Sequence, residues 1–381
     1  MSEKKRVPEL RFGEFSGEWE TSKLENYCIK IASGKSKQEK DGNYNLYGST
    51  GIIGKTNEYS NNGKFILIAR VGANAGLTNI VNGKFGVTDN TLVIDLNDNV
   101  EIDFILSLLQ KYNLNKLIFG SGQPLITGGQ LKNLKLAFPS KPEQEKIASF
   151  LSSVDRKIEQ LSKKKTLLEQ YKKGVMQKIF SQELRFKEDD GSEFSEWREE
   201  KVSAFMIERN IKTPKSKEYP LMAFVAYKGV TDKGDRYNRE FLVNDGDNKK
   251  YKQTEYGDFI YSSNNLETGS IGLNRYGSAT ISPVYSVFQI TESCDYKFIS
   301  TLLKTKSFIN KMIRYRQGVV YGQWRIHESH FLNIKVDIPC IQEQTKIATF
   351  LSSLDKKIEL TDKELNTTKK FKKALLQKMF V

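Results

Sequence analysis

The amino-acid sequence contains a long internal repeat. Residues 139–180 and 339–380 are identical at 20 of 42 aligned positions, at a constant offset of 200 residues. The same offset extends upstream, where Gly122-Gln123 falls on Gly322-Gln323. A chain of 381 residues is long enough for two domains, each with its own core. The repeat therefore predicts two equivalent units arranged in tandem.

A second marker opens each unit. Leu10-Arg11-Phe12 recurs as Leu184-Arg185-Phe186, and a Phe-Ser pair and a Glu-Trp pair follow each copy, the latter at Glu18-Trp19 and Glu196-Trp197. Between this opening motif and the repeated segment the two copies share little sequence. The repeated segments thus predict a structure and role that both units share, and the variable regions predict the property in which the two units differ.

The variable regions are expected to be small mixed domains. Apolar, β-branched runs between turns rich in Gly and Asn predict strands at Lys64–Val71, Thr91–Leu96, Phe259–Ser262 and Val284–Ile290. One helix per copy is expected, at Ile102–Tyr112 and Tyr296–Ile313. The predicted fold class is α+β, with two globular α/β domains joined by two long helices in a pseudo-two-fold repeat.

The repeated segments are predicted to be the long helices. Ser140 and Glu143 have the spacing of a capping box, and Pro142 lies in the first turn, where a missing N–H is harmless. Apolar residues then recur over five heptads, which favours a coiled coil over a surface helix. The predicted seam contains Ile147, Leu151, Val154, Ile158, Leu161 and Leu168 in the first copy, and Ile347, Leu351, Leu354, Ile358, Leu365 and Leu375 in the second.

Polar residues interrupt both stripes of this seam. They are Lys165 and Lys172 in the first copy and Thr361, Thr368 and Lys372 in the second. Such gaps are unfavourable in a homo-oligomer and suit one specific intramolecular pairing. Because a whole domain separates the two copies, we predict an antiparallel pair of helices.

These observations predict four segments. They are a first domain at 1–139, a first helix at 140–182, a second domain at 183–338 and a second helix at 339–381. A helix of 38 residues spans roughly 57 Å, which exceeds one turn of B-DNA. If the two domains read DNA, their half-sites are expected about one turn apart, and the half-sites should differ because the domains differ.

Charge indicates the class of partner. The formal net charge is +14, and residues 143–180 and 343–380 each hold nine Lys/Arg against five Asp/Glu. This balance favours nucleic acid first and an acidic membrane surface second, while a solvated lysine-rich surface is the alternative. Residues 1–6 are charged and apolar runs are short, so we expect a cytoplasmic protein with no membrane association.

No pattern in the sequence supports catalysis or metal binding. Gly48–Thr56 approaches a phosphate-binding loop, but its glycine spacing is one residue too long and a loop follows it. His327 and His330 lack the spacing and the third ligand of a zinc site. The three cysteines are far apart, and no Asn/Asp-Pro-Pro-aromatic run of an adenine methyltransferase is present. We expect neither catalytic residues nor a bound metal or cofactor.

The chain resembles the specificity subunit of type I restriction–modification systems over its full length. The resemblance rests on E-Q-x-K-I-A-x-F-L-S-S-x-D-x-K-I-E at 143–159 and 343–359, on the opening motifs, and on Tyr47–Gly54 followed by Ile68–Gly72. It implies two target-recognition domains, each reading half of a split double-stranded DNA sequence. It also implies two partner modification subunits that methylate adenine with S-adenosylmethionine, and ATP-driven restriction subunits recruited through them.

DNA-contacting residues are expected on glycine-rich turns, because base edges and phosphates are read by Arg, Lys, Asn and Gln. The candidates in the first domain are Lys35, Lys37, Arg70, Asn74 and Gln123. Those in the second domain are Arg236, Arg239, Asn264, Arg275, Arg314, Arg316, Gln323 and Arg325. A solvated surface role is the alternative for each residue, and a scaffold turn is the alternative for the aligned Gly-Gln pairs.

The start of each long helix is a candidate partner surface. An apolar seam does not account for Ser152, Ser153 and Asp155 matching Ser352, Ser353 and Asp355. Docking of partner subunits on Glu143–Glu159 and Glu343–Glu359 is therefore our hypothesis, with solvated helix faces as the alternative. For the whole chain, a coiled-coil scaffold without DNA specificity is the alternative function.

Overall fold

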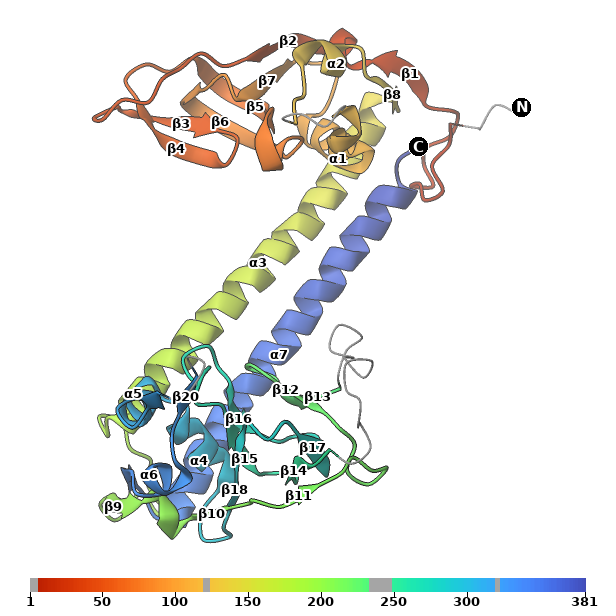
Figure 1. Cartoon of the computed structure of the whole chain (residues 1–381). Helices are drawn as coiled ribbons and strands as arrows, with labels where there is room; N and C mark the ends of the chain where they lie inside the picture. The colour runs from red at the N-terminus through yellow and green to blue at the C-terminus, as the bar shows by residue number, and fades with distance from the viewer. Residues whose placement is uncertain (1–5, 119–123, 233–248, 319–322) are drawn as a thin grey trace. The chain divides into compact units, whose positions relative to one another are not determined.

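The computed structural model describes residues 6–118, 124–232, 249–318 and 323–381 (Figure 1). The chain forms two compact units, the first comprising Met1–Thr166 with Glu359–Val381 and the second Leu167–Ile358. The long helices are α3 (Lys141–Phe180) and α7 (Ile341–Lys378), and each contributes one part to either unit.

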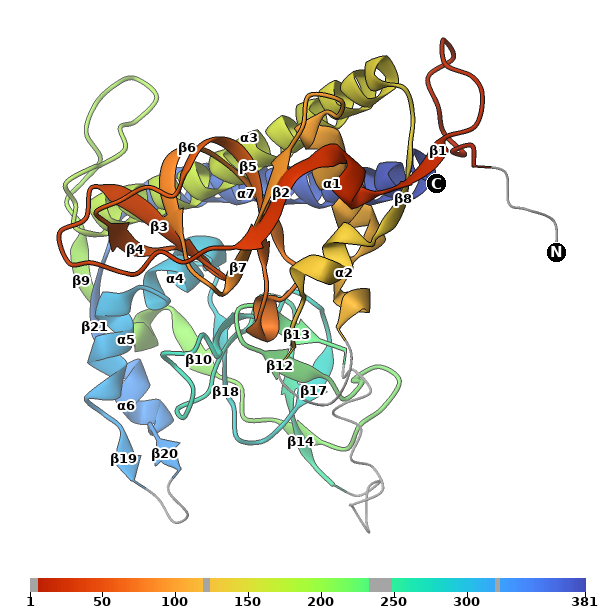
Figure 2. The same ribbon diagram turned by 90° about the horizontal axis from the view of Figure 1, so that it is seen from above.

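Unit 1 contains a six-stranded sheet in the order β2–β7–β5–β6–β3–β4 (Figure 2). Its neighbouring strands are antiparallel except for the parallel pair β3 and β6. The strands are β2 (Cys28–Ser33), β3 (Tyr44–Gly48), β4 (Gly51–Thr56), β5 (Asn61–Ala69), β6 (Thr78–Val87) and β7 (Thr91–Leu96). A separate pair joins β1 (Glu20–Lys23) to β8 (Lys135–Phe138).

The helices of unit 1 cover the main core. Phe104, Ile105 and Leu108 of α1 (Ile102–Tyr112) are buried with Ile66 and Ile94 of the sheet. The short helix α2 (Gly128–Lys132) begins at Thr127, whose side chain forms a capping box with Gln130. A smaller core of four residues lies on other sheet positions, namely Leu67, Val81, Phe85 and Val87.

Unit 2 repeats part of this architecture. Its four-stranded sheet has the order β10–β18–β15–β16, which corresponds strand for strand to β2–β7–β5–β6. These strands are β10 (Met206–Glu208), β15 (Phe259–Tyr261), β16 (Ile271–Leu273) and β18 (Ser286–Ile290). The pair of β9 (Arg198–Lys201) with β21 (Lys335–Ile338) corresponds to β1 with β8.

The remaining strands of unit 2 differ from those of unit 1. A three-stranded sheet has the order β11–β14–β17, and two further pairs are β12–β13 and β19–β20. Their bounds are β11 (Lys212–Thr213), β12 (Ala223–Val225), β13 (Gly229–Thr231), β14 (Tyr251–Thr254), β17 (Ala279–Ile281), β19 (Gln317–Gly318) and β20 (Trp324–Arg325). The two units therefore share one framework and carry different additions.

The predicted strand Thr91–Leu96 and helix Ile102–Tyr112 are confirmed as β7 and α1. The prediction of one helix at Tyr296–Ile313 is wrong, because this segment forms α4 (Tyr296–Leu303) and α5 (Lys306–Ile313). The break has a local cause: the Thr305 side chain accepts a hydrogen bond from Phe308 N and starts a new helix. A further short helix, α6 (Glu328–Leu332), precedes β21.

The two long helices pair in antiparallel fashion. In unit 1, Asp155 of α3 binds Lys372 of α7 at 2.6 Å, and Lys165 binds Asp362 at 2.7 Å, so the partner number falls as the α3 number rises. In unit 2, Lys172 binds Asp355. Lys165, Lys172 and Lys372, which interrupt the apolar stripes, thus form ion pairs across the two helices, and Lys157 of α3 also pairs with Glu364 of α7 at 2.9 Å.

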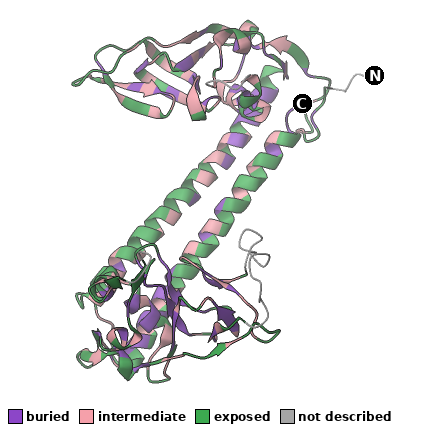
Figure 3. Cartoon of the chain, in the orientation of Figure 1, coloured by how far each residue is buried: buried purple, intermediate pink, exposed green. Residues whose placement is uncertain are grey.

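The predicted seam residues are mostly buried, and buried positions alternate with exposed ones along both helices (Figure 3). Ile158, Leu168 and Ile358 are only partly buried. At the start of each helix the seam merges with a domain core. Ile147, Leu151 and Val154 pack with Trp19 and Phe104 in unit 1, and the equivalent Ile347, Leu351 and Leu354 lie in the core of unit 2.

Candidate nucleic-acid interface

The opening motif of each repeat binds the first turn of the following long helix. Arg11 Nε and Nη2 donate to the two carboxylate oxygens of Glu143 at 2.8 and 2.7 Å, and Trp19 Nε1 donates to the same carboxylate at 3.3 Å. In unit 2, Arg185 Nη2 lies 2.8 Å and Trp197 Nε1 3.2 Å from Glu343. Both glutamates are buried. These matched residues fix each domain to its helix.

The other identities at the helix starts also have internal partners. Gln144 accepts a hydrogen bond from Glu101 N, and Gln344 accepts one from Asp295 N. Asp155 and Asp355 form the ion pairs between the helices, and Ser153 and Ser353 donate to carbonyl groups of their own helix. Asp155, Asp355, Ser153 and Ser353 thus have internal partners, which the matching Ser152 and Ser352 lack among the described residues, and docking of partner subunits on Glu143–Glu159 and Glu343–Glu359 stays a prediction.

In unit 1 the turn at residues 88–90 brings several candidate loops together. The Asn90 carbonyl oxygen accepts from Arg70 N at 3.0 Å and from Ser49 Oγ at 2.8 Å. Gly34 N donates to Thr91 O at 3.1 Å, which places Lys35 beside the same turn. Lys35 and Lys37 are exposed. Unit 1 therefore gathers Lys35 and Arg70 around one turn.

Arg70 also contacts the segment that follows Gln123. Its carbonyl oxygen accepts from Ile126 N at 2.9 Å, and Val71 forms a β-bridge with Leu125. The guanidinium is partly buried and donates to the Asp89 carbonyl oxygen at 3.4 Å. Asn74 is partly buried in the next turn, and Gln123 itself lies outside the described residues.

Unit 2 builds the corresponding site with different side chains. Asn264 Oδ1 accepts from Trp324 N at 2.6 Å, and Ser263 Oγ accepts from Ile326 N at 3.0 Å. Ile326 is aligned with Ile126 in the repeat, so in both units the same backbone N–H binds the loop that follows a central strand, β5 or β15. Asn264, Gln323 and Arg325 are therefore brought together.

The remaining candidates of unit 2 have diverse positions. Arg316 forms a two-pronged ion pair with Glu267, at 2.7 and 2.6 Å, which holds the start of β19 against the 263–269 loop. This hydrogen bonding lowers the pKa of the Glu267 carboxyl. Arg314 and Arg275 are exposed and show no ion pair within the described part of the chain. Arg236 and Arg239 lie outside the described residues.

Two exposed aromatic residues beside these candidates were not predicted from the sequence. Trp324 is 49% and Tyr315 41% exposed, and they adjoin Gln323 and Arg316 along the chain. Large exposed aromatic side chains next to Arg and Gln are suited to stack on bases or sugars. The alternation of aromatic and Arg residues in Arg314–Arg316 and Trp324-Arg325 was the available signal.

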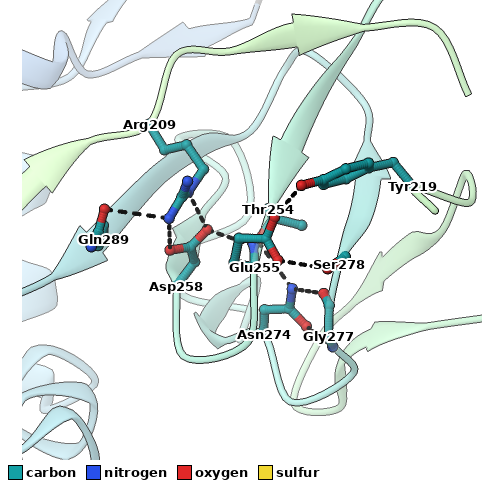
Figure 4. Close-up of polar contacts among 9 residues, drawn as sticks. All are labelled: Arg209, Tyr219, Thr254, Glu255, Asp258, Asn274, Gly277, Ser278 and Gln289. Atoms are coloured by element: carbon teal, nitrogen blue, oxygen red, sulfur yellow. Dashed lines mark hydrogen bonds and ion pairs between the residues drawn. The ribbon is translucent and has the colours of Figure 1, made fainter.

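A buried polar network in unit 2 supports the fold rather than chemistry (Figure 4). Arg209 binds Asp258 at 2.7 and 3.2 Å, and Asp258 also accepts from Glu255 N at 2.7 Å. Burial raises the pKa of Asp258, and the hydrogen bonds and Arg209 oppose that rise. Asn274 donates to Thr254 and to the Gly277 carbonyl oxygen. The Asp258 carboxylate thus has hydrogen-bond donors from Arg209 and Glu255 N, and the network stabilises the chain around Asp258 and Asn274.

The motifs that resembled catalytic or metal sites have structural roles. Gly48–Thr56 comprises the last residue of β3, a turn and β4, and Gly48 pairs with Gly51, so no helix follows a glycine loop there. His327 lies at the N-cap of α6, and the His330 ring lies 5.6 Å from that of Tyr315. Burial raises the pKa of the Cys28 thiol to about 12.

Within the four described ranges, no group of His, Cys, Asp and Glu side chains could hold a metal ion. Nor does any helix there have the length and apolar character needed to cross a membrane.

Comparisons with known proteins agree with this architecture. The model of the family described as "Type I restriction modification DNA specificity domain" matches residues 16–170 and 205–370. The MjaVIII specificity subunit of Methanocaldococcus jannaschii is 26% identical over 409 residues, covering 97% of this chain and 92% of the relative. The EcoprrI specificity subunit of Escherichia coli is 35% identical over 112 residues, 29% of this chain and 28% of that one.

A solved structure shows the same fold. The S subunit of a type I restriction–modification system from M. genitalium superimposes with a TM-score of 0.67 at 18% identity, over 98% of this chain and 99% of that one. The family model matches the chain in two successive segments, which together cover most of the sequence and follow the internal repeat. The chain therefore belongs to the type I restriction–modification DNA specificity family and carries two copies of its domain.

Proposed function

We propose that this chain reads a split, asymmetric sequence in double-stranded DNA, with one recognition domain per half-site. The observation that carries the proposal is the matched loop geometry of the two units. In both, the N–H groups of the aligned Ile126 and Ile326 bind the loop that follows β5 or β15, through Arg70 O in unit 1 and Ser263 Oγ in unit 2. The side chains presented there differ: Arg70 and Asn74 in one unit, Asn264 and Arg325 in the other. Loops that are held by equivalent backbone hydrogen bonds but carry different side chains are suited to contact two different half-sites.

We further propose that the chain binds two modification subunits, which methylate adenine using S-adenosylmethionine, and through them ATP-driven restriction subunits. The chain itself would hold no cofactor and perform no catalysis. Support comes from the family assignment and from the relatives, whose names describe specificity subunits of type I restriction enzymes. Since chromosomal DNA is the proposed target, we propose the cytoplasm as the place of action.

Selection from a random duplex pool tests this function. The full chain is mixed with modification subunits, bound duplexes are sequenced, and a bipartite sequence with a fixed spacer is expected to be enriched. Exchanging residues 15–138 for those of a relative is expected to change one half-site only. A pool without any enriched bipartite sequence would support a scaffold without DNA specificity, and a change in both half-sites would contradict the assignment of one domain to each half.

A further inference from the structure

A cavity of unit 2 is lined by several lysines and has apolar walls. Its volume is about 1100 Å³, and it lies among the end of α3, the break between α4 and α5, β21 and part of α7. Five lysines line it: Lys172, Lys173, Lys304, Lys306 and Lys311. Met176, Phe180, Trp197 and Phe308 contribute apolar wall. Glu169, Asp337 and Asp355 also line it, so the five lysines outnumber the three carboxylates, and the cavity offers net positive charge together with apolar surface.

Within the described residues, three of these lysines have no hydrogen-bond or ion-pair partner, although Asp355 acts on Lys304 through its charge. Lys172 binds Asp355, and Lys311 Nζ donates to the Lys335 carbonyl oxygen at 3.0 Å. Throughout the described ranges, no hydrogen bond or ion pair involves the side chains of Lys173, Lys304 and Lys306. Lys304 is exposed and lines the cavity. Desolvation first, and then Arg275 and Lys172, lower its pKa to about 8.

Unit 1 has a cavity in the corresponding place. It measures about 330 Å³ and is lined by Leu108 of α1 and by Leu136 and Ala137 of β8. The repeat aligns Leu136 and Ala137 with Val336 and Asp337, which line the cavity of unit 2. Four cations line it: Arg6, Lys111, Lys116 and Lys135. Lys111 donates to the Val381 carbonyl oxygen, and no ion pair involves Arg6, Lys116 or Lys135 in the part of the chain that the structure describes.

The positive charge recurs without recurrence of sequence. Lys116 and Lys135 of unit 1 do not align with Lys304 and Lys306 of unit 2, yet the cations surround equivalent cavities. Inheritance of individual residues from the duplication therefore does not explain the match. The recurrence of cations is explained if both cavities have the same function. Binding of one anionic ligand per unit would be such a function.

We propose that each cavity binds an acidic segment with apolar side chains from one modification subunit, so that one chain holds two copies. This inference rests on the proposed function and locates its protein interface. A protein segment suits the sites better than DNA, because Met176, Phe180 and Trp197 form walls that a phosphate backbone leaves uncovered. The candidate DNA loops are also different elements, at 263–269 and 323–326.

Charge reversal at each cavity tests the proposal on the full chain. One variant carries Lys173→Glu, Lys304→Glu and Lys306→Glu, and the other carries Lys116→Glu and Lys135→Glu. The matched control carries Lys163→Glu, Lys356→Glu and Lys363→Glu, which are exposed helix positions outside both cavities. Native mass spectrometry with purified modification subunit gives the stoichiometry, titration gives Kd, and a gel shift gives DNA affinity.

Each cavity variant is expected to bind one modification subunit instead of two, with the lost site weakened at least about tenfold. Combining both variants should abolish assembly, and the control should behave as the unmodified chain. Thermal melts verify folding, and Lys304→Met with Lys306→Met, which keeps the apolar stems, should weaken binding in the same direction.

Two bound subunits with unchanged Kd in the cavity variants would overturn the proposal. So would a loss of DNA affinity with intact assembly, since the cavities would then bind phosphates. If the unmodified chain binds no modification subunit, the proposed function fails as well, and that result is visible before any variant is made.

Discussion

The guanidinium of Arg11 holds the buried carboxylate of Glu143 through two hydrogen bonds, of 2.8 and 2.7 Å. The two residues are 132 positions apart in sequence, and the pair ties the opening motif to the first turn of α3. Arg185 and Glu343 repeat it in unit 2, where the hydrogen bond raises the pKa of Arg185. The same clamp therefore fastens each domain to its helix.

Removal of this clamp is expected to destabilise unit 1. Arg11→Ala leaves a carboxylate that is 2% exposed without its cation, which should cost about 3 kcal/mol of unfolding free energy. Urea denaturation followed by tryptophan fluorescence measures the loss. The double variant Arg11→Met with Glu143→Leu removes both charges and should lose less than Arg11→Ala. Equal or greater loss in the double variant would contradict the electrostatic explanation.

The ion pair between Asp155 and Lys372 is expected to specify the helix pairing. Lys372→Glu places two carboxylates together and should lower the unfolding free energy by about 1 kcal/mol, and adding Asp155→Lys should restore most of it. The cost should shrink in high salt because one partner is exposed. A double-mutant cycle in denaturant gives the interaction free energy, and failure of the charge swap to rescue would assign the loss to packing.

Lys304 is expected to give unit 2 a pH-dependent stability. Its pKa is about 8 in the folded chain and 10.5 ordinarily, so between these values only the unfolded state retains the proton. Stability therefore rises with pH across this window, and the destabilisation is fully present below pH 8. Lys304→Met should stabilise the chain at pH 7 by about 1 kcal/mol, a modest value because solvent reaches the amine.

Thermal melts from pH 7 to 10 measure this effect. The advantage of Lys304→Met over the unmodified chain should diminish as the pH rises above 8. A constant difference across that range would show that packing, rather than the charge, is responsible. Lys306→Met at the same cavity is the control, since it removes a lysine that is exposed and lines the same cavity.

Arg325 and Trp324 are expected to act on one half-site. Arg325→Ala should lower affinity about tenfold and relax base preference in the half read by unit 2, while the other half stays unchanged. Trp324→Ala should lower affinity without a change in preference if its ring stacks. Lys163→Ala on α3 serves as the control. Selected-sequence profiles of the variants, measured at two salt concentrations, separate base contacts from phosphate contacts, and relaxation in both halves would refute the assignment.

Glu267 is expected to position the paired strands β19 and β20 rather than touch DNA. Its ion pair with Arg316 anchors the start of β19, so Glu267→Gln should reduce specificity for the half-site of unit 2 while nonspecific affinity changes little. Competition gel shifts with specific and random duplexes provide the ratio. A parallel fall of both affinities would indicate unfolding of these paired strands, and Glu267→Asp, which keeps the charge, should recover part of the specificity.

The long helices were predictable because the heptad period and the internal repeat are both local in sequence. Lys372 and Lys172 were recognised as interruptions of the stripe, but their partners Asp155 and Asp355 depend on the register between two distant segments. Glu143 was interpreted as part of a capping box, whereas its carboxylate binds Arg11 and Trp19. The matched Arg, Trp and Glu positions of the two repeats contained that information, since all three recur together.

The interior of unit 2 was less predictable. The break at Thr305 falls within a continuous apolar pattern, and only the hydrogen bond from Phe308 N distinguishes a new helix start. Asp258 and Arg209 lie 49 residues apart, and nothing in the local sequence of either identifies the other. The candidate DNA loops could be proposed from composition, but their assembly through Ile126 and Ile326 required the three-dimensional structure.

The start of the first repeat has a further consequence. Leu10 N donates to the Lys378 carbonyl oxygen at 2.8 Å, and Leu184 N donates to the Lys178 carbonyl oxygen at 3.0 Å. Lys178 and Lys378 are aligned in the repeat, so each opening motif docks on the last turns of a long helix, whether or not the polypeptide runs directly from one to the other. This contact therefore forms in unit 1 without the direct chain connection that accompanies it in unit 2, so it does not depend on the order in which the opening motif and the helix occur in the sequence.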